Sequence, residues 1–162
     1  MAFIRVKTIH DKPYAYLVEN VSTENGPRQK VKQYLGRIYD ASALGKETTR
    51  DLVTGDSRKE FLLNLVLREM PGFQANKDQF NFENTVFCPK SFTVRRFTKS
   101  GNDKETILSL HGGYLSSFTL QRIIDFNKTK NVEKDARILA KYFLEAGLLI
   151  SQEEFISFYE MI

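Results

Sequence analysis

Cationic and tyrosine side chains alternate with other residues near the N-terminus. In an extended strand every second side chain lies on the same face, so this alternation gathers cations and rings on one surface. Long cations neutralise phosphates and release counterions, while tyrosine rings stack on bases. The pattern therefore predicts a face that binds nucleic acid. Its expected members are Arg5, Lys7, Tyr14, Tyr16, Arg28, Lys30, Lys32, Tyr34 and Arg37.

The same alternation also fits an ordinary solvated sheet face whose lysines oppose edge-to-edge aggregation. A two-residue loop at Asp11 and Lys12 would pair Lys7 with Tyr16 and keep the cations and tyrosines of the first two strands on one face. A loop of another length would exchange those faces. The composition of the face therefore depends on the strand register.

A second basic segment, KSFTVRRFTKSGNDK, adds Arg95, Arg96 and Lys99 to the candidate nucleic-acid contacts. Neighbouring residues of a strand point to opposite faces, so at most one of the two arginines is expected to join a given phosphate-binding surface. The other is expected to pair with an acidic group. A hairpin that reaches along a nucleic acid and a plain solvated hairpin tip are both compatible with this segment.

Enzymatic alternatives have weaker support. Cys88 and His111 could act as nucleophile and base, but a single cysteine is more often a small core residue. His111-Gly112-Gly113 followed by Ser116 and Ser117 has some similarity to an oxyanion loop, yet the G-x-S-x-G elbow of hydrolases is missing. The sequence also lacks a phosphate-binding glycine motif and a zinc-type Cys/His spacing. We therefore expect no catalytic residues, no cofactor and no metal, with a small hydrolase as the third-ranked function.

Strand patterns dominate the first 40 residues. Residues 3–10 and 14–21 alternate around a turn at Asp11-Lys12-Pro13, and residues 28–35 form a third strand after the Asn-Gly pair in STENGP. Gly36 is expected to end it. Further along, residues 86–98 and 105–110 flank the turn signal KSGND and predict a hairpin.

Helix signals are concentrated in the rest of the chain. Ser57 and Glu60 form a capping-box pattern in front of FLLNLVLREM, which predicts a central helix ending near Met70. The C-terminal third contains three more predicted helices, with N-caps at Asn131 and Ser151 and a C-terminal glycine at Gly147. Their expected ranges are 117–126, 132–146 and 152–161.

The charge is distributed unevenly. The net charge is +4 for the whole chain, with +3 in residues 1–40, +5 in 86–130 and −3 in 131–162. The acidic C-terminal end opposes phosphate approach, so its helices are expected to form core and to contact a protein partner. The sequence has neither a signal peptide nor an apolar run of membrane-spanning length, which predicts a cytoplasmic protein without membrane contact.

The runs YAYLVEN and RQKVKQYLGR also carry a family resemblance. The N-terminal 40 residues or so resemble the N-terminal strand module of insertion-sequence transposases and of uncharacterised archaeal proteins. This resemblance implies an attachment module for DNA or another polyanion. The chain is too short for a transposase catalytic core and shows no acidic triad, so transposition itself is not implied.

These patterns together predict an α+β protein. Residues 1–40 are expected to form a basic three-stranded antiparallel β-meander, and residues 41–162 a mixed domain with a central helix, a β-hairpin and a C-terminal helical bundle. The predicted function is non-catalytic binding of DNA or structured RNA, as an accessory or regulatory subunit of a nucleoprotein complex. The alternative is a protein-interaction adaptor without a nucleic-acid role.

Overall fold

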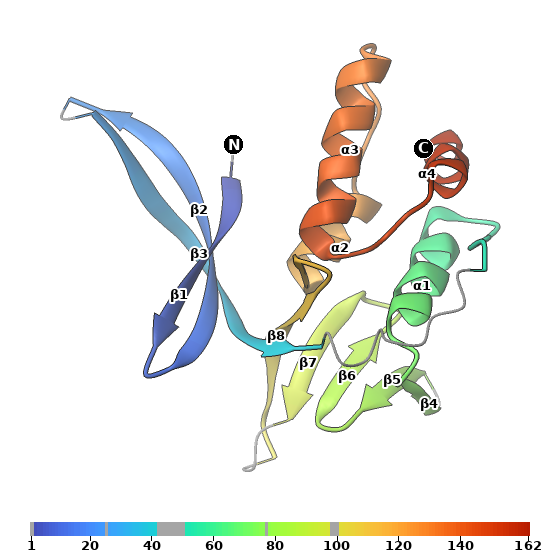
Figure 1. Cartoon of the computed structure of the whole chain (residues 1–162), viewed down its shortest axis with the longest axis horizontal. Coiled ribbons are helices and arrows are strands. Elements are labelled where there is room, and N and C mark those ends of the chain that lie inside the picture. The colour runs from blue at the N-terminus through green and yellow to red at the C-terminus, as the bar shows by residue number, and fades with distance from the viewer. Residues whose placement is uncertain (1, 25, 42–50, 77, 98–100) are drawn as a thin grey trace.

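The computed structural model describes residues 2–24, 26–41, 51–76, 78–97 and 101–162. Strands and helices follow one another along the chain as shown in Figure 1. The first strands are β1 (Ala2–Ile9), β2 (Lys12–Thr23) and β3 (Gly26–Asp40), and helix α1 (Arg58–Glu69) comes next. The later strands are β4 (Gln74–Asn76), β5 (Gln79–Phe82), β6 (Thr85–Cys88), β7 (Thr93–Phe97), β8 (Asp103–Leu110) and β9 (Gly113–Leu115). The last three helices are α2 (Ser117–Ile124), α3 (Val132–Ala146) and α4 (Gln152–Glu160).

The described strands form one nine-stranded sheet. Its order is β1-β2-β3-β8-β7-β6-β5-β4, with β9 added to β8. The strands β3 and β8 pair in parallel over residues 37–40 and 106–109, and the other pairs are antiparallel. The expected α+β fold class is therefore wrong. The protein is a mixed α/β structure in which β1–β3 belong to the same sheet as the later strands.

The single sheet arises because the third strand is longer than expected. Gly36 was expected to end the third strand, but β3 continues to Asp40 and uses its last residues to pair with β8. A parallel pair between segments so far apart in sequence leaves no local periodic signal. The division of the chain near residue 40 stays a prediction.

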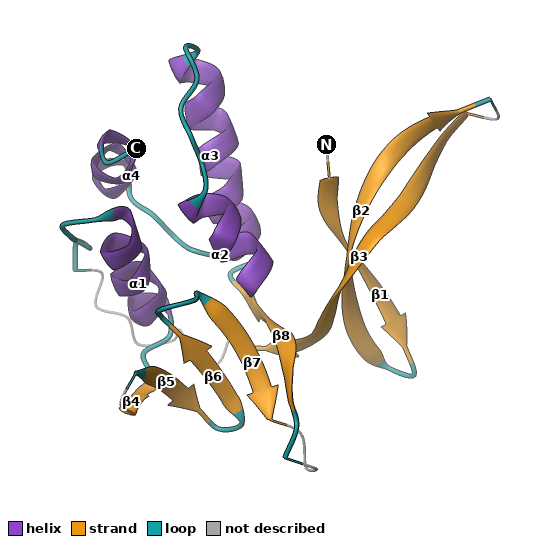
Figure 2. Ribbon diagram, turned by 180° about the vertical axis from the view of Figure 1, so that it is seen from behind, coloured by secondary structure: helices purple, strands orange, loops and turns teal. Residues whose placement is uncertain are grey.

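The three N-terminal strands form a long, twisted ribbon that projects away from the helices (Figures 1 and 2). Three antiparallel strands in this part of the chain were predicted and are confirmed. The first turn lies at His10 and Asp11, both with positive φ, instead of at Asp11 and Lys12. The register therefore pairs Lys7 with Tyr14 and Arg5 with Tyr16. It differs by two residues from the expected one, so each side chain keeps its expected face.

The remaining part of the sheet contains more strands than the single expected hairpin. The run expected as one strand over 86–98 is divided into β6 and β7, because residues 89–92 form a turn in which Phe92 has positive φ. Residues 73–85, which have no clear sequence pattern, contribute β4 and β5. The predicted turn KSGND lies partly outside the described residues.

The helices begin where their capping residues predicted. The side chains of Ser57, Asn131 and Ser151 accept hydrogen bonds from backbone N–H groups of α1, α3 and α4. Gly147 ends α3 in the left-handed conformation, as expected for a C-terminal glycine. The four helices lie on the side of the molecule that holds β4–β9 and do not cover the ribbon (Figure 2). None of the helices in the described residues is long and apolar enough to cross a membrane.

The main core lies between the helices and the sheet. Phe61, Phe143 and Phe158 are fully buried and pack edge to face. A smaller cluster at the base of the ribbon joins Ala15, Leu35, Ile38 and Ile107. This second cluster holds β2 and β3 against β8 and so fixes the ribbon to the rest of the protein.

A network of charged side chains connects α1 with α4. The guanidinium group of Arg68 donates to Glu69 and to Glu154, both of which are buried. Glu154 also accepts from the backbone N–H of Val53. His111 Nε2 lies 2.9 Å from Glu69. Paired in this way, the buried carboxylates avoid the large cost of an isolated buried charge.

Candidate nucleic-acid interface

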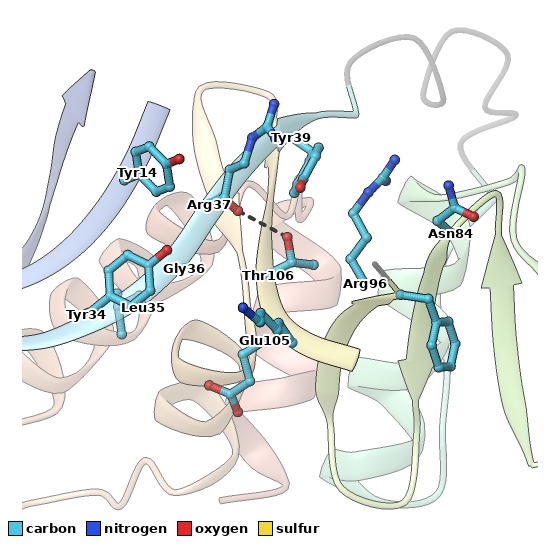
Figure 3. Close-up of a pocket in the computed structure, with 12 residues that line it drawn as sticks. Tyr14, Tyr34, Leu35, Gly36, Arg37, Tyr39, Asn84, Arg96, Glu105 and Thr106 are labelled. Atoms are coloured by element: carbon cyan, nitrogen blue, oxygen red, sulfur yellow. Dashed lines mark hydrogen bonds between the residues drawn. The ribbon is translucent and has the colours of Figure 1, made fainter. Parts of the chain in front are cut away.

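A concave pocket of about 780 Å³ lies where β3 leaves β2 and joins β8. Figure 3 shows that side chains from the ribbon and from the β7–β8 part of the sheet meet there. The lining contains three tyrosine rings and three cationic side chains, and its one acidic residue is Glu105. The lining residues are Tyr14, Tyr34, Leu35, Gly36, Arg37, Tyr39, Asn84, Arg96, Phe97, Lys104, Glu105 and Thr106.

Gly36 allows β3 to approach β8 closely beside this pocket. Its φ is +131°, a value that other residues rarely adopt. A Cβ atom at this position would lie 2.8 Å from the carbonyl oxygen of Glu105. The ladder between β2 and β3 shifts by one residue next to it, which is a β-bulge, and such a bulge bends a strand. Beyond the bulge, the hydroxyl of Thr106 donates to the carbonyl oxygen of Arg37.

Arg37 and Arg96 both stack on the ring of Tyr39. Their Cζ atoms lie 4.7 Å and 4.2 Å from its centroid, and Figure 3 shows the ring between the two side chains. Such cation–π contacts orient a guanidinium without neutralising its charge. The Nε of Arg37 is buried and has no hydrogen-bond partner among the described residues. A buried donor without a partner is unusual in a folded protein and marks this arginine as a candidate ligand-binding group.

Arg96 has neighbours in β6, in β8 and in the turn between β5 and β6. Its Nη1 donates to the hydroxyl of Thr85 at 3.1 Å, while Glu83 lies 3.9 Å from its Nη2. Lys104 is its partner in the β7–β8 ladder and therefore lies on the same face. Figure 3 shows the carboxylate of Glu105 pointing away from Arg37, Tyr39 and Arg96. The lining of the pocket therefore contains three cations and the one carboxylate of Glu105.

Three tyrosines continue this surface from the pocket onto the ribbon. The ring of Tyr34 lies 6.3 Å from that of Tyr14 and 5.4 Å from that of Tyr16, measured between centroids. Tyr34 is 54% exposed. Its partial burial, together with the neighbouring tyrosines, raises the pKa of Tyr34 above the ordinary value. The phenol is therefore neutral near pH 7 and does not repel an anion.

Two cations from β1 lie beside these rings. The Nζ of Lys7 is 5.5 Å from the centroid of Tyr16, and Arg5 donates to the side chain of Gln29. Cross-strand partners share a face, so the register places six of the predicted residues together. We call this group the tyrosine face. Its members are Arg5, Lys7, Tyr14, Tyr16, Tyr34 and Arg37.

The other basic residues of β3 lie on the opposite face of the ribbon. A second bulge shifts the ladder between Leu17 and Val18, so that Lys30 faces Glu19 and Arg28 faces Val21. Lys32 forms an ion pair with Glu19 at 3.1 Å. The expectation of a single basic face across all three strands is therefore wrong. Each bulge adds one residue to β3 and exchanges the faces of the residues that follow.

The two arginines of β7 lie on opposite faces of the sheet, as predicted for neighbouring residues of a strand. Arg96 lines the pocket, whereas Arg95 lies on the other face and forms an ion pair with Asp103 at 2.6 Å. The expected pairing of one arginine with an acidic group is confirmed. Lys99 lies outside the described residues.

Two residues that line the pocket, Tyr39 and Lys104, were not among the predicted site residues, although Lys104 was expected near the turn of the second hairpin. The alternation that starts in the third strand continues through Gly36 as Arg37, Ile38 and Tyr39, and this continuation was the available signal. The turn signal KSGND ends directly before Lys104, so the sequence suggests a turn there. In the structure Lys104 belongs to β8 and pairs with Arg96. Its approach to Arg37 depends on the parallel β3–β8 pair, for which no local signal exists.

The other candidate groups lie elsewhere. His111 contacts Glu69, and Cys88 is a half-buried thiol at the end of β6. Within the described parts of the chain, no group of three or more His, Cys, Asp or Glu side chains could hold a metal ion. Several acidic side chains of the C-terminal helices are paired, for example Glu133 with Arg137 and Glu145 with Arg122. A protein partner for these helices stays a prediction.

Comparison with protein-family models, with curated proteins and with solved structures finds no match. The assignment of a function therefore depends on the geometry of the site.

Proposed function

We propose that this chain is a non-catalytic nucleic-acid-binding protein whose binding site is the pocket together with the tyrosine face. The observation that carries the proposal is the pair of guanidinium groups stacked on Tyr39, next to three cross-strand tyrosine residues. Cations held at fixed positions suit phosphates, and neighbouring rings suit bases.

Charge supports the same assignment. Among the described residues, Arg37 and Lys104 form no ion pair. Arg96 forms a long one, in which its Nη2 lies 3.9 Å from the carboxylate of Glu83. Arg37 and Lys104 can therefore take a phosphate without breaking an ion pair, whereas Arg96 would exchange its long contact with Glu83 for one. Arg95, Arg28, Lys30 and Lys32 lie on the other faces and are not part of the proposed site.

The resemblance of the first 40 residues to the N-terminal module of insertion-sequence transposases supports the same class of ligand. That module is implied to attach to DNA or another polyanion. The residues that carry the resemblance include Tyr14, Tyr16, Tyr34 and Arg37, and all four belong to the tyrosine face.

The experiment compares Arg96→Gln with Arg137→Gln, since each variant loses one positive charge. Arg137 is an exposed arginine of α3, outside the proposed site. Dissociation constants for labelled DNA and RNA are measured by anisotropy over a range of salt concentrations. Loss of one phosphate contact should lower the slope of log K against log salt by about 0.7 to 0.9 in Arg96→Gln only. Absence of binding, or equal slopes for the two variants, would refute the proposed function.

A further inference from the structure

We infer that the site takes an unpaired strand, with one nucleotide entering the pocket, and discriminates against duplex. This inference rests on the proposed function and concerns the class of nucleic acid that the site recognises. It follows from the depth of the cations, the exposure of the rings and the extension of the site along the ribbon.

Two of the three cations of the pocket, Arg37 and Arg96, are partly buried, whereas Lys104 is exposed. The side chain of Arg96 is 23% exposed, and the unpaired Nε of Arg37 is buried. The phosphates of a duplex lie on the outside of a wide, stiff cylinder. A flexible unpaired strand can bring a single phosphate into a concave site, whereas a duplex meets mainly the rim.

The rings offer stacking surface that a duplex cannot use. In a duplex each base is covered on both faces by its neighbours, so an aromatic side chain can stack only on a base that is unstacked or extruded. Tyr34 is the most exposed ring of the site and is one of the residues that line the pocket. It lies in the position where the base of an entering nucleotide could stack.

The site also extends beyond the dimensions of one nucleotide. From Tyr34 the tyrosine face continues to Tyr16, where Lys7 lies over the ring, and then to Arg5. Alternating rings and cations along a track are the arrangement by which proteins hold single strands without reading sequence. A free mononucleotide would leave this track empty. A strand of several nucleotides would use both the track and the pocket.

The test uses the full chain and labelled oligonucleotides of about 12 nucleotides, in the range of known single-strand sites. A single strand and its matched duplex, as DNA and as RNA, are titrated against the wild type, Tyr34→Leu and Tyr34→Phe. Tyr34 belongs to neither core cluster, so both substitutions should leave the protein folded, and thermal unfolding checks this. The phenylalanine variant keeps a ring, whereas the leucine variant keeps only apolar bulk.

We expect the wild type to bind the single strand at least about tenfold more tightly than the duplex. Tyr34→Leu should lose about 5- to 150-fold of its single-strand affinity, the equivalent of 1 to 3 kcal/mol for one stacked base. Its duplex affinity should stay within about twofold, and Tyr34→Phe should resemble the wild type.

The outcomes separate the two claims. Equal or tighter binding of duplex, or an equal loss for both ligands in Tyr34→Leu, would overturn the single-strand inference. If Arg96→Gln still lowered the salt slope in that case, the proposed function would stand. Absence of binding to all four ligands would overturn both.

Discussion

The guanidinium of Arg96 on β7 stacks on the ring of Tyr39 on β3, with 4.2 Å between Cζ and the ring centroid. The two strands are not neighbours in the sheet, because β8 lies between them. The contact therefore spans a strand and connects the end of the ribbon strand β3 to the β4–β8 part of the sheet. It also places two cations, Arg37 and Arg96, around one ring.

Replacing Tyr39 tests what this ring does. Tyr39→Leu keeps all the charges but removes the π face, so nucleic-acid affinity should fall by about 5- to 30-fold, from two cation–π contacts of about 0.5 to 1 kcal/mol each. The salt slope should remain that of the wild type, because the number of cations is unchanged. Tyr39→Phe retains the ring and should bind normally. Titration by anisotropy at several salt concentrations measures both quantities; a lower slope in Tyr39→Leu would mean that the ring does more than orient the arginines.

Gly36 is predicted to be essential for the close approach of β3 to β8. An alanine there must adopt a φ of +131° and place its Cβ against the backbone of Glu105, so Gly36→Ala should lower the free energy of unfolding by about 2 to 4 kcal/mol. Gly101 is a matched control, because it also has positive φ, but among the described residues no atom beyond its chain neighbours lies within 4 Å of the place that a Cβ would take. Gly101→Ala should cost only about 1 kcal/mol, from the backbone conformation alone. Urea unfolding of both variants measures the difference, and equal losses would show that the contact with β8 is not the constraint.

The buried carboxylate of Glu154 should make stability depend on pH. Burial raises the pKa of this group, but hydrogen bonds from Ser151 and Val53 and the ion pair with Arg68 outweigh burial and hold the pKa below its ordinary value. A carboxyl group with a lowered folded-state pKa stabilises the protein above its unfolded-state value of about 4.3, and this contribution is lost as pH falls through the folded-state pKa.

Glu154→Gln removes this contribution. We expect the variant to be less stable than the wild type by about 1 to 3 kcal/mol at pH 7, since Arg68 then keeps Glu69 alone of its two carboxylate partners among the described residues. The difference should narrow below about pH 4.3, where the wild-type group takes up a proton. Urea unfolding at pH 7 and at acidic pH provides the measurement. A difference that stays constant across this range would mean that the charge of Glu154 is not involved.

Local signals predicted much of the secondary structure. Caps at Ser57, Asn131 and Ser151 placed three helices, and the N-terminal alternation predicted three strands. These features depend on residues close together in sequence, which is why periodicity and capping chemistry reveal them.

The arrangement of the site could not be predicted in the same way. The bulges in β3 decide whether Lys30 or Tyr34 shares a face with Tyr16, and neither bulge has a residue pattern that fixes its position. The meeting of Arg37 with Arg96 depends on the long-range β3–β8 pair. Sequence therefore identified most of the residue types in the site, whereas the structure decided which of them act together.

The most direct test of the proposed site compares two double variants that each lose two positive charges. Arg37→Gln/Arg96→Gln empties the pocket of its stacked cations, and Lys30→Gln/Lys32→Gln removes cations from the opposite face of the ribbon. The measurement is the slope of log K against log salt for a labelled single strand. We predict that the pocket variant lowers the slope by about 1.4 and that the ribbon variant lowers it by less than about 0.5. An equal decrease in both, or a larger decrease in the ribbon variant, would contradict the assignment of binding to the pocket and the tyrosine face.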